Sequence, residues 1–378
     1  AVVHKITNST TGAMSYGTPV VFESADIDQG ASSNRHTVFD SGSNRIVTAF
    51  TDTGDSNKGK AIVGSVNAGS ETISFGTVVE FESGSTSFIN AVYDSNVDRT
   101  VIFYRDTGDS GKGKAVVATV TAGSNSIAFG TPTIYHDGIT YHQASAFDPD
   151  NNKILIMYDD RTGGNTGEAK VATVTGGGTN SIAFGTAAQF QSGNPPNNIS
   201  VGYDTTNNKF IAAYTDEDNS NYTTLIVGTI TGTDVSFGAE TVIHQNSSIE
   251  HAVTFDPDLE RMVVASVDTT NHRIYVDYVG ISGTTATSQG SVTVLDVSPS
   301  NLLDGAVTLT YDPDLNKMVL MFEDEGYDLN GMMLNAAFDT SLSTNLTNSN
   351  YLGVAAETIS DTNTGKITVN GGVNENQT

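Results

Sequence analysis

The chain has 378 residues, of which 43 are acidic and 17 are basic, so its formal net charge is −26. This charge repels phosphate backbones and anionic membrane surfaces and excludes nucleic acid as a partner. The sequence contains no cysteine, hence no disulfide or thiolate metal site, and no apolar run near the ~18 residues of a membrane span, so we expect no membrane insertion.

Residues 1–24 match the second half of a repeat. Tyr16–Pro19 reads Tyr-Gly-Thr-Pro, and Phe129–Pro132 reads Phe-Gly-Thr-Pro. The glycine of this signature returns at steps in the fifties, at Gly76, Gly130, Gly185, Gly238 and Gly290. The chain therefore begins in mid-repeat, which is typical of a ring closed by both chain ends.

Six copies of the pattern Asp-x4-(Lys/Arg)-x6-Asp follow, at steps of 52 to 56 residues. The first acid comes after an aromatic residue, at Asp40, Asp94, Asp148, Asp204, Asp256 and Asp312. The base is Arg45, Arg99, Lys153, Lys209, Arg261 or Lys317. A period near fifty indicates an array of one supersecondary unit. We expect the first acid to cap its own turn and the base to pair with it.

Each full copy predicts four strands. The first, such as His36–Phe39, ends at the aromatic-Asp pair, and the second, such as Ile154–Tyr158, is apolar throughout, which indicates burial on both faces. The third alternates, as in Lys60–Val66, and the fourth carries Phe-Gly-Thr and is the most polar, as expected of an outer edge strand. No segment has the periodicity and caps of a helix.

These units predict an all-β fold, a β-propeller of four-stranded blades. We expect seven blades, the last built from residues 1–24 together with strands near Val354–Ile359 and Lys366–Asn370; six blades with an N-terminal clasp is the alternative. Residues 1–350 form the predicted propeller. Residues 351–378 either complete its last blade or begin a further module.

The order of elements resembles sialidase-type propellers with Asp-box (BNR) repeats, where two outer strands with a glycine-turn signature follow the inner hairpin. Ser126–Thr131 stands roughly where the Ser-x-Asp-x-Gly-x-Thr-Trp box would fall, although the box itself is absent. The Thr-, Ser-, Gly- and Asp-rich copies also resemble repeat regions of marine phage tail-fibre and virion-surface proteins and of bacterial surface proteins. The resemblance implies an extracellular or virion-surface location.

The second acid of each copy has two interpretations. It caps the loop that follows, or it joins the neighbouring loop acids in a ring of oxygen ligands suited to Ca²⁺, the one cofactor that the sequence suggests. The candidate ligands are Asp52, Asp55, Asp106, Asp109, Asp160, Asp216, Asp218, Asp268 and Asp324.

The loops that enter each first strand vary most between copies and lie on the same predicted face as these acids. Variable loops on a repeated scaffold are a usual place for recognition. Six residues after each signature glycine stands a polar residue: Glu23, Glu82, His136, Gln191, His244 or Asp296. With Tyr141, His142, His251 and Phe88 nearby, this rim is a candidate site for a glycan or a protein receptor; a merely solvated rim is the alternative.

Catalysis is the competing hypothesis. A sialidase needs three arginines on one face, an acid, and a tyrosine nucleophile with a carboxylate partner. Arg35, Arg105 and Arg161 fall near the predicted face but at non-equivalent positions, and Tyr104 and Tyr158 fall in buried strands. The histidines show no three-ligand zinc pattern. The sequence therefore predicts a non-enzymatic module for adhesion, receptor binding or decoration, with a carbohydrate-active hydrolase and a purely structural virion or surface-layer component as alternatives.

Overall fold

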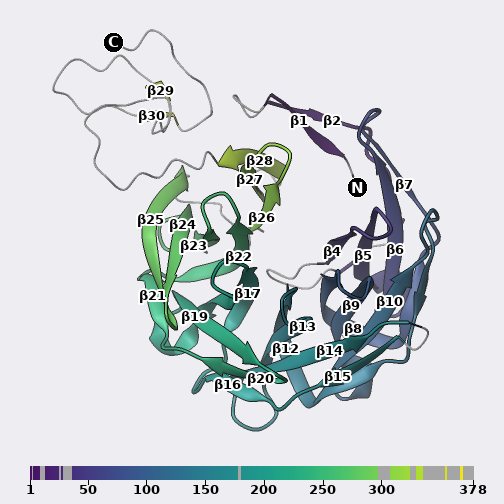
Figure 1. Ribbon diagram of the computed structural model, residues 1–378, viewed down its shortest axis with the longest axis horizontal. Coiled ribbons are helices and arrows are strands. Elements are labelled where there is room, and N and C mark those ends of the chain that lie inside the picture. Colours follow the sequence, from purple (N-terminus) through teal and green to yellow (C-terminus); the bar gives the residue numbers. More distant parts are fainter. Residues whose placement is uncertain are drawn as a thin grey trace, which may run out of the picture.

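A computed structural model describes residues 1, 3–8, 13–24, 27–28, 36–177, 180–296, 307–323, 329–334, 354–355 and 367–368. Among the described residues the regular elements are antiparallel strands and three short 3-10 turns, η1 (Thr53–Asp55), η2 (Thr107–Asp109) and η3 (Glu217–Asn219). The strands form blades that follow one another around a common centre (Figure 1). The protein is a β-propeller, as the repeat predicts.

Three blades are continuous in strand pairing, because two long strands each pass from one blade into the next. Blade 1 consists of β3 (Ile27–Asp28), β4 (Thr37–Asp40), β5 (Arg45–Asp52), β6 (Lys58–Asn67), β7 (Thr72–Phe75) and the start of β8 (Val79–Asp94). Blade 2 consists of the rest of β8, β9 (Arg99–Asp106), β10 (Lys112–Val120), β11 (Ile127–Phe129) and the start of β12 (Thr133–Asp148). Blade 3 consists of the rest of β12, β13 (Lys153–Asp160), β14 (Thr166–Thr175), β15 (Ser181–Phe184) and β16 (Ala188–Gln191).

The later repeats form separate sheets. Blade 4 consists of β17 (Asn197–Asp204), β18 (Lys209–Asp216), β19 (Tyr222–Thr231), β20 (Asp234–Phe237) and β21 (Thr241–His244). Blade 5 consists of β22 (Ser248–Asp256), β23 (Arg261–Asp268), β24 (Arg273–Ser282) and β25 (Thr285–Asp296). A further sheet holds β26 (Val307–Asp312), β27 (Lys317–Glu323) and β28 (Leu329–Leu334). Two hairpins remain, β1 (His4–Asn8) with β2 (Ala13–Tyr16) and β29 (Val354–Ala355) with β30 (Ile367–Thr368).

The first strand of each repeat is the innermost. The contacts between β8 and β12, β12 and β17, β17 and β22, and β22 and β26 join successive blades near the centre. In Figure 1, β17, β22 and β26 lie inward, whereas β7, β15, β16 and β25 lie at the rim. The sequential four-strand order and the polar outer edge are both as predicted.

The apolar second strands are buried because each lies between two neighbouring blades. Ile156 and Tyr158 of β13 pack into a core shared with blade 2, whereas Leu155 and Met157 pack into a core shared with blade 4. All four side chains are fully buried. A strand that contributes to two cores has no polar face, which explains the unbroken apolar run.

The signature glycine lies where one blade touches the next. The N–H of Gly185 donates to the carbonyl of Val171 in its own blade at 2.9 Å. A Cβ at this position would lie 1.9 Å from the backbone carbonyl oxygen of Thr233 in blade 4. Cβ atoms built at Gly76, Gly130 and Gly238 would likewise lie 1.8–2.4 Å from a carbonyl oxygen of the following blade. The glycine therefore recurs because the blades approach too closely for a side chain.

The N-terminal hairpin shows the same relation to blade 1. The N–H of Gly17 donates to Val3 at 2.8 Å, and a Cβ there would lie 1.7 Å from the carbonyl oxygen of Glu71. The N-terminal hairpin thus packs on blade 1 as each blade packs on its successor, which agrees with a half repeat. Among the described strands, β1 pairs with β2 and β29 pairs with β30 in two separate two-stranded sheets. The pairing that would join them into a seventh blade is therefore not described, and both the seventh blade and the domain boundary near residue 350 stay predictions.

The first acid of each repeat caps its turn, as predicted. Asp148 Oδ1 accepts from the N–H groups of Asp150 and Asn151, both at 3.0 Å, and the other five copies accept from equivalent amides. The predicted pairing of this acid with the base five residues later is wrong among the described residues. Arg45 lies opposite Asp40 in the strand register but donates to the carbonyls of Ser43 and Asn44.

Candidate functional site: an arginine and tyrosine cluster at the loop face

The second acids of blades 1 and 2 are neutralised within their own blade. Asp52 accepts from the N–H of Asp55 at 3.1 Å and bonds to Lys60 Nζ at 2.6 Å. The carboxylates of Asp52 and Asp55 both bond to the Lys60 ammonium and raise its pKa above the ordinary range. The arrangement returns in the next blade at Asp106, Asp109 and Lys114.

In blades 3 to 5 the second acids bond to amides, a hydroxyl or a histidine. Asp216 accepts from the N–H of Asp218 at 3.1 Å, and Asp218 accepts from Gln191 Nε2 at 2.9 Å. Asp268 accepts from the side-chain amides of Asn246 and Asn271. Each described copy thus caps its loop, while Asp324 lies outside the described residues and calcium binding stays a prediction.

Four of the polar residues after the signature glycine bond to a side chain of the next blade: Glu82, His136, Gln191 and His244. Glu82 of blade 1 accepts from the Tyr104 hydroxyl of blade 2 at 2.9 Å. His244 of blade 4 lies 2.6 Å from Asp277 of blade 5 and stacks on Tyr275 at 4.2 Å between ring centroids. These side chains are therefore at blade junctions and not on an open rim. Glu23 bonds to the N–H of Ser24, and Asp296 ends β25 opposite Arg273.

A bulge near the start of four innermost strands turns one side chain out of register. The bulged residue has a left-handed backbone, with φ of 49° at Phe88, 46° at His142, 51° at Asn198 and 49° at Glu250. Strand pairing shifts register at each of these places. Bulges commonly re-aim side chains next to functional sites. The four residues occupy equivalent positions in blades 2 to 5.

The bulge of blade 3 brings a cluster of rings and guanidiniums together. The guanidinium carbons of Arg105 and Arg161 lie 4.1 and 4.8 Å from the centroid of the Tyr141 ring. Phe88 meets the same ring edge-on at 5.0 Å, and its centroid lies 5.3 Å from that of His142. Stacking on an aromatic ring holds a guanidinium plane in place. We name these five residues the Arg105–Arg161 cluster.

Arg161 is the more exposed of the two arginines and forms an ion pair with a buried aspartate. Its Nε donates to Asp159 Oδ2 at 2.7 Å, and its Nη2 lies 3.4 Å from Asn197 Oδ1. Burial raises the pKa of Asp159 to about 6, although the nearby Arg161 opposes this shift. Asn197 in turn bonds to Glu217 at the start of η3.

Arg105 differs because it makes no ion pair within the part of the chain that the structure describes. Its side chain is half-buried, and its Nε is a buried donor with no hydrogen-bond partner there. A buried donor without a partner costs about 1–3 kcal/mol, and more when it is charged. Arg45 Nε is likewise without a partner, but Arg105 also lies over the Tyr141 ring beside a second guanidinium, and in a chain of net charge −26 this arrangement suggests an anionic ligand.

The sequence predicted Tyr141 and His142 as binding residues and placed Arg105 and Arg161 near this face. It did not identify Asp159, Asn197 or the stacking of both arginines on one ring. The one signal was local: Asp159-Asp160-Arg161 departs from Thr51-Asp52-Thr53 of the first copy.

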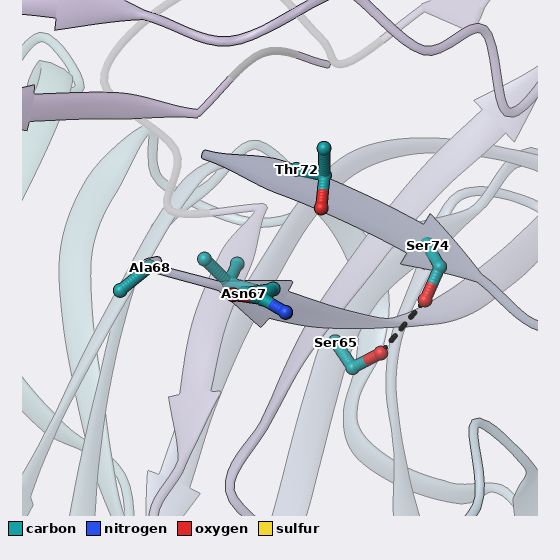
Figure 2. Close-up of a pocket in the computed structure, with 6 residues that line it drawn as sticks. Ser65, Asn67, Ala68, Thr72 and Ser74 are labelled. Carbon is teal, nitrogen blue, oxygen red and sulfur yellow. Dashed lines mark hydrogen bonds between the residues drawn. The ribbon is translucent and has the colours of Figure 1, made fainter. Parts of the chain in front are cut away.

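A shallow depression of about 530 Å³ lies elsewhere, at the far ends of β6 and β7. Figure 2 shows its polar lining, in which Ser65 and Ser74 share a hydrogen bond of 2.8 Å. It is lined by Ser65, Val66, Asn67, Ala68, Thr72 and Ser74, with no charged or aromatic side chain, and we assign it no function.

His251 lies inside the propeller, and we expect its burial to make stability depend on pH. It is 1% exposed, and its Nδ1 lies 3.0 Å from the carbonyl oxygen of Asn198. Burial lowers the pKa of His251 to about 4, whereas an unfolded histidine has a pKa near 6.5. The unfolded state therefore binds a proton first as the pH falls from about 6.5 to about 4, and stability decreases by roughly 3 kcal/mol across that window.

We expect His251→Gln to flatten this part of the stability curve. The measurement is the free energy of unfolding in denaturant at several pH values between 7 and 4, for both proteins. Asp159 works in the opposite direction in both, since its raised pKa favours the folded state on acidification. Identical slopes in the two proteins would contradict the placement of His251 as a buried neutral imidazole.

No protein-family model matches the chain, and no curated protein matches it significantly. Among solved structures, a candidate 6-phosphogluconolactonase from Bacteroides uniformis is similar with a TM-score of 0.58 and 10% identity, covering 87% of this chain and 94% of that one. A second candidate of that name from Bacteroides fragilis has a TM-score of 0.52 and 10% identity over 86% and 87%. A variant of AofleA from Arthrobotrys oligospora, in which three arginines are replaced by alanine, has a TM-score of 0.51 and 12% identity over 82% and 86%.

At these identities the comparisons show a shared fold alone. The resemblance to sialidase-type repeats is confirmed only as far as an all-β propeller. Within the described residues, no helix is long and apolar enough to cross a membrane.

Proposed function

We propose that this propeller is a non-enzymatic recognition module that binds a carboxylate-bearing glycan at the Arg105–Arg161 cluster. The observation that carries the proposal is the pair of guanidiniums over the Tyr141 ring, one of which has no carboxylate partner among the described residues. Planar guanidiniums bind carboxylates through paired hydrogen bonds. The cluster has the chemistry of an acidic-sugar site.

The surroundings favour a sugar over a small inorganic anion. Phe88 and Tyr141 pack against each other edge to face and are both half-buried, so part of each residue remains accessible. Aromatic rings beside a few fixed polar groups are typical of ligand sites. Asn197 and His142 add hydrogen-bonding groups next to the arginines.

An extracellular or virion-surface location belongs to this proposal. Its support is the resemblance of the Thr-, Ser-, Gly- and Asp-rich copies to repeats of surface proteins. In that setting the glycan would be part of a receptor. A protein receptor that offers an exposed carboxylate would use the same two arginines, and a purely structural virion subunit would not need them.

A hydrolase is the second candidate, because Asp159 combines burial, a pKa raised to about 6 and a neighbouring arginine. Perturbed carboxyls of this kind are candidates for general acid or base catalysis. Turnover of a bound sugar or lactone that is lost in Asp159→Asn would establish this alternative. Binding without turnover would exclude it for that compound.

The binding site is tested with Arg105→Gln, which removes the charge and keeps the length of the side chain roughly similar. We expect affinity for an acidic glycan to fall by roughly 10- to 100-fold, the range for losing a charge-assisted hydrogen bond. Isothermal titration calorimetry with a glycan selected on an array provides the measurement.

Lys112→Gln is the matched control, since it changes the net charge equally but removes a lysine that pairs with Asp109 and Asp137. It is expected to bind within about twofold of the wild type, because surface ion pairs contribute little. Equal losses in both variants would mean that the effect is general electrostatics, and the proposed site would be wrong.

A further inference from the structure

A second constellation lies at the junction of blades 2 and 3, and its Asp160 directly precedes Arg161 of the Arg105–Arg161 cluster. His136 of β12, Asp160 of β13 and Glu168 of β14 each offer a ligand atom, and these atoms lie within 4.8 Å of one another. His136 Nε2 is 3.0 Å from Asp160 Oδ1. The donors come from three strands and two blades, so it is the fold, and not proximity in the sequence, that brings them together.

The preceding junction provides an internal comparison. At the equivalent positions between blades 1 and 2 stand Glu82, Asp106 and Lys114. There the ammonium of Lys114 bonds to Asp106 Oδ2 at 2.6 Å. At the junction of blades 2 and 3, Glu168 thus takes the place of Lys114, and His136 takes the place of Glu82.

The substitutions change the charge balance at the junction. In formal charge, with histidine counted as zero, Glu82, Asp106 and Lys114 sum to −1, whereas His136, Asp160 and Glu168 sum to −2. Within the described part of the chain, no lysine or arginine lies within ion-pair distance of Asp160 or Glu168. Two close carboxylates without a cation destabilise a fold, and a divalent ion brings the sum to zero.

The carboxylates are already oriented by outer partners. The Tyr158 hydroxyl donates to Glu168 Oε2 at 3.0 Å, and the N–H of Thr162 donates to Asp160 Oδ1 at 2.8 Å. Hydrogen bonds of this kind fix the ligands around protein metal sites. The His136 and Asp160 side chains keep 16% and 12% exposure, which leaves a route for an ion.

We propose that His136, Asp160 and Glu168 bind one divalent transition-metal ion of the Zn²⁺ class. Imidazole nitrogen and carboxylate oxygen are both ligand types of Zn²⁺, and three protein ligands leave the fourth position of a tetrahedral site open. The nitrogen disfavours Ca²⁺, which takes oxygen ligands. The ion joins the outer strand of blade 2 to the inner strands of blade 3.

The test is titration of the EDTA-treated, desalted protein with Zn²⁺ by calorimetry, together with the Co²⁺ absorption spectrum. We expect one equivalent of Zn²⁺ to bind, the melting temperature to rise with Zn²⁺, and Co²⁺ to give visible absorption bands. Glu168→Lys recreates the Lys114 arrangement, so it should fold and lose the site. His136→Gln should weaken binding by at least about tenfold.

His244→Gln is the control, because His244 also bonds to an aspartate at a blade junction but belongs to no three-ligand group among the described residues. It should bind Zn²⁺ as the wild type does. Absence of stoichiometric binding by the wild type would overturn the proposal. Unchanged binding by both Glu168→Lys and His136→Gln would overturn it as well, and the proposed glycan site would be unaffected by either result.

Discussion

Replacing Ile156 with aspartate is expected to leave the protein unfolded. Ile156 is fully buried in the core that blades 2 and 3 share, beside Phe103 and Tyr158. A carboxylate there has no cation partner and costs several kcal/mol, while natural domains are stable by only about 5–15 kcal/mol. Circular dichroism and size-exclusion chromatography would show loss of the cooperative melting transition and of the elution peak of the compact protein.

The same substitution at an exposed isoleucine separates burial from a general effect of added charge. Ile134 of β12 is 43% exposed, so Ile134→Asp should remain folded and melt close to the wild type. A soluble, cooperatively melting Ile156→Asp protein would refute the assignment of β13 as an inner strand between two cores.

Gly185→Ala is expected to lower the free energy of unfolding by about 3 kcal/mol, at the upper end for overpacking. The added Cβ would lie 1.9 Å from the carbonyl oxygen of Thr233, and a backbone carbonyl cannot move aside as a flexible side chain does. Blades 3 and 4 would have to separate. Denaturant unfolding monitored by tyrosine fluorescence gives the measurement.

Gly163→Ala provides the matched control, because nothing lies within 4 Å of a Cβ at that position. We expect its stability to stay within about 0.5 kcal/mol of the wild type, as is usual for surface positions. If the two alanine variants were equally stable, the signature glycine would not be explained by blade contact.

The repeat made the fold predictable. A 52–56-residue period with an apolar second strand and a polar fourth strand is sufficient for a propeller, because each strand's burial depends on its place in the blade. The turn caps at Asp148 and its copies were predictable for the same reason, since they depend on contacts within four residues. The partner of Arg99 was not, because its Nε donates to Asn180, 81 residues away in the next blade.

The candidate site was predictable as a set of residues but not as an arrangement. Tyr141 and Arg161 were recognisable because they depart from the repeated pattern at predicted loop ends. Their contact depends on the bulge at His142, for which the sequence carries no local signal, since Phe88, Asn198 and Glu250 at the equivalent bulges share no chemistry. The Zn²⁺-class ligands were missed as a group because His136 and Asp160 lie in different blades.

The measurement that tests the central claim most directly is binding of the purified protein to an array of paired glycans. Each acidic glycan is printed beside the same glycan with its carboxylate reduced to an alcohol. The Arg105–Arg161 cluster predicts saturable binding to the carboxylated member of at least one pair, at least about tenfold stronger than to its reduced partner and weakened by salt. Equal binding to both members, or no binding to any acidic glycan, would contradict the account.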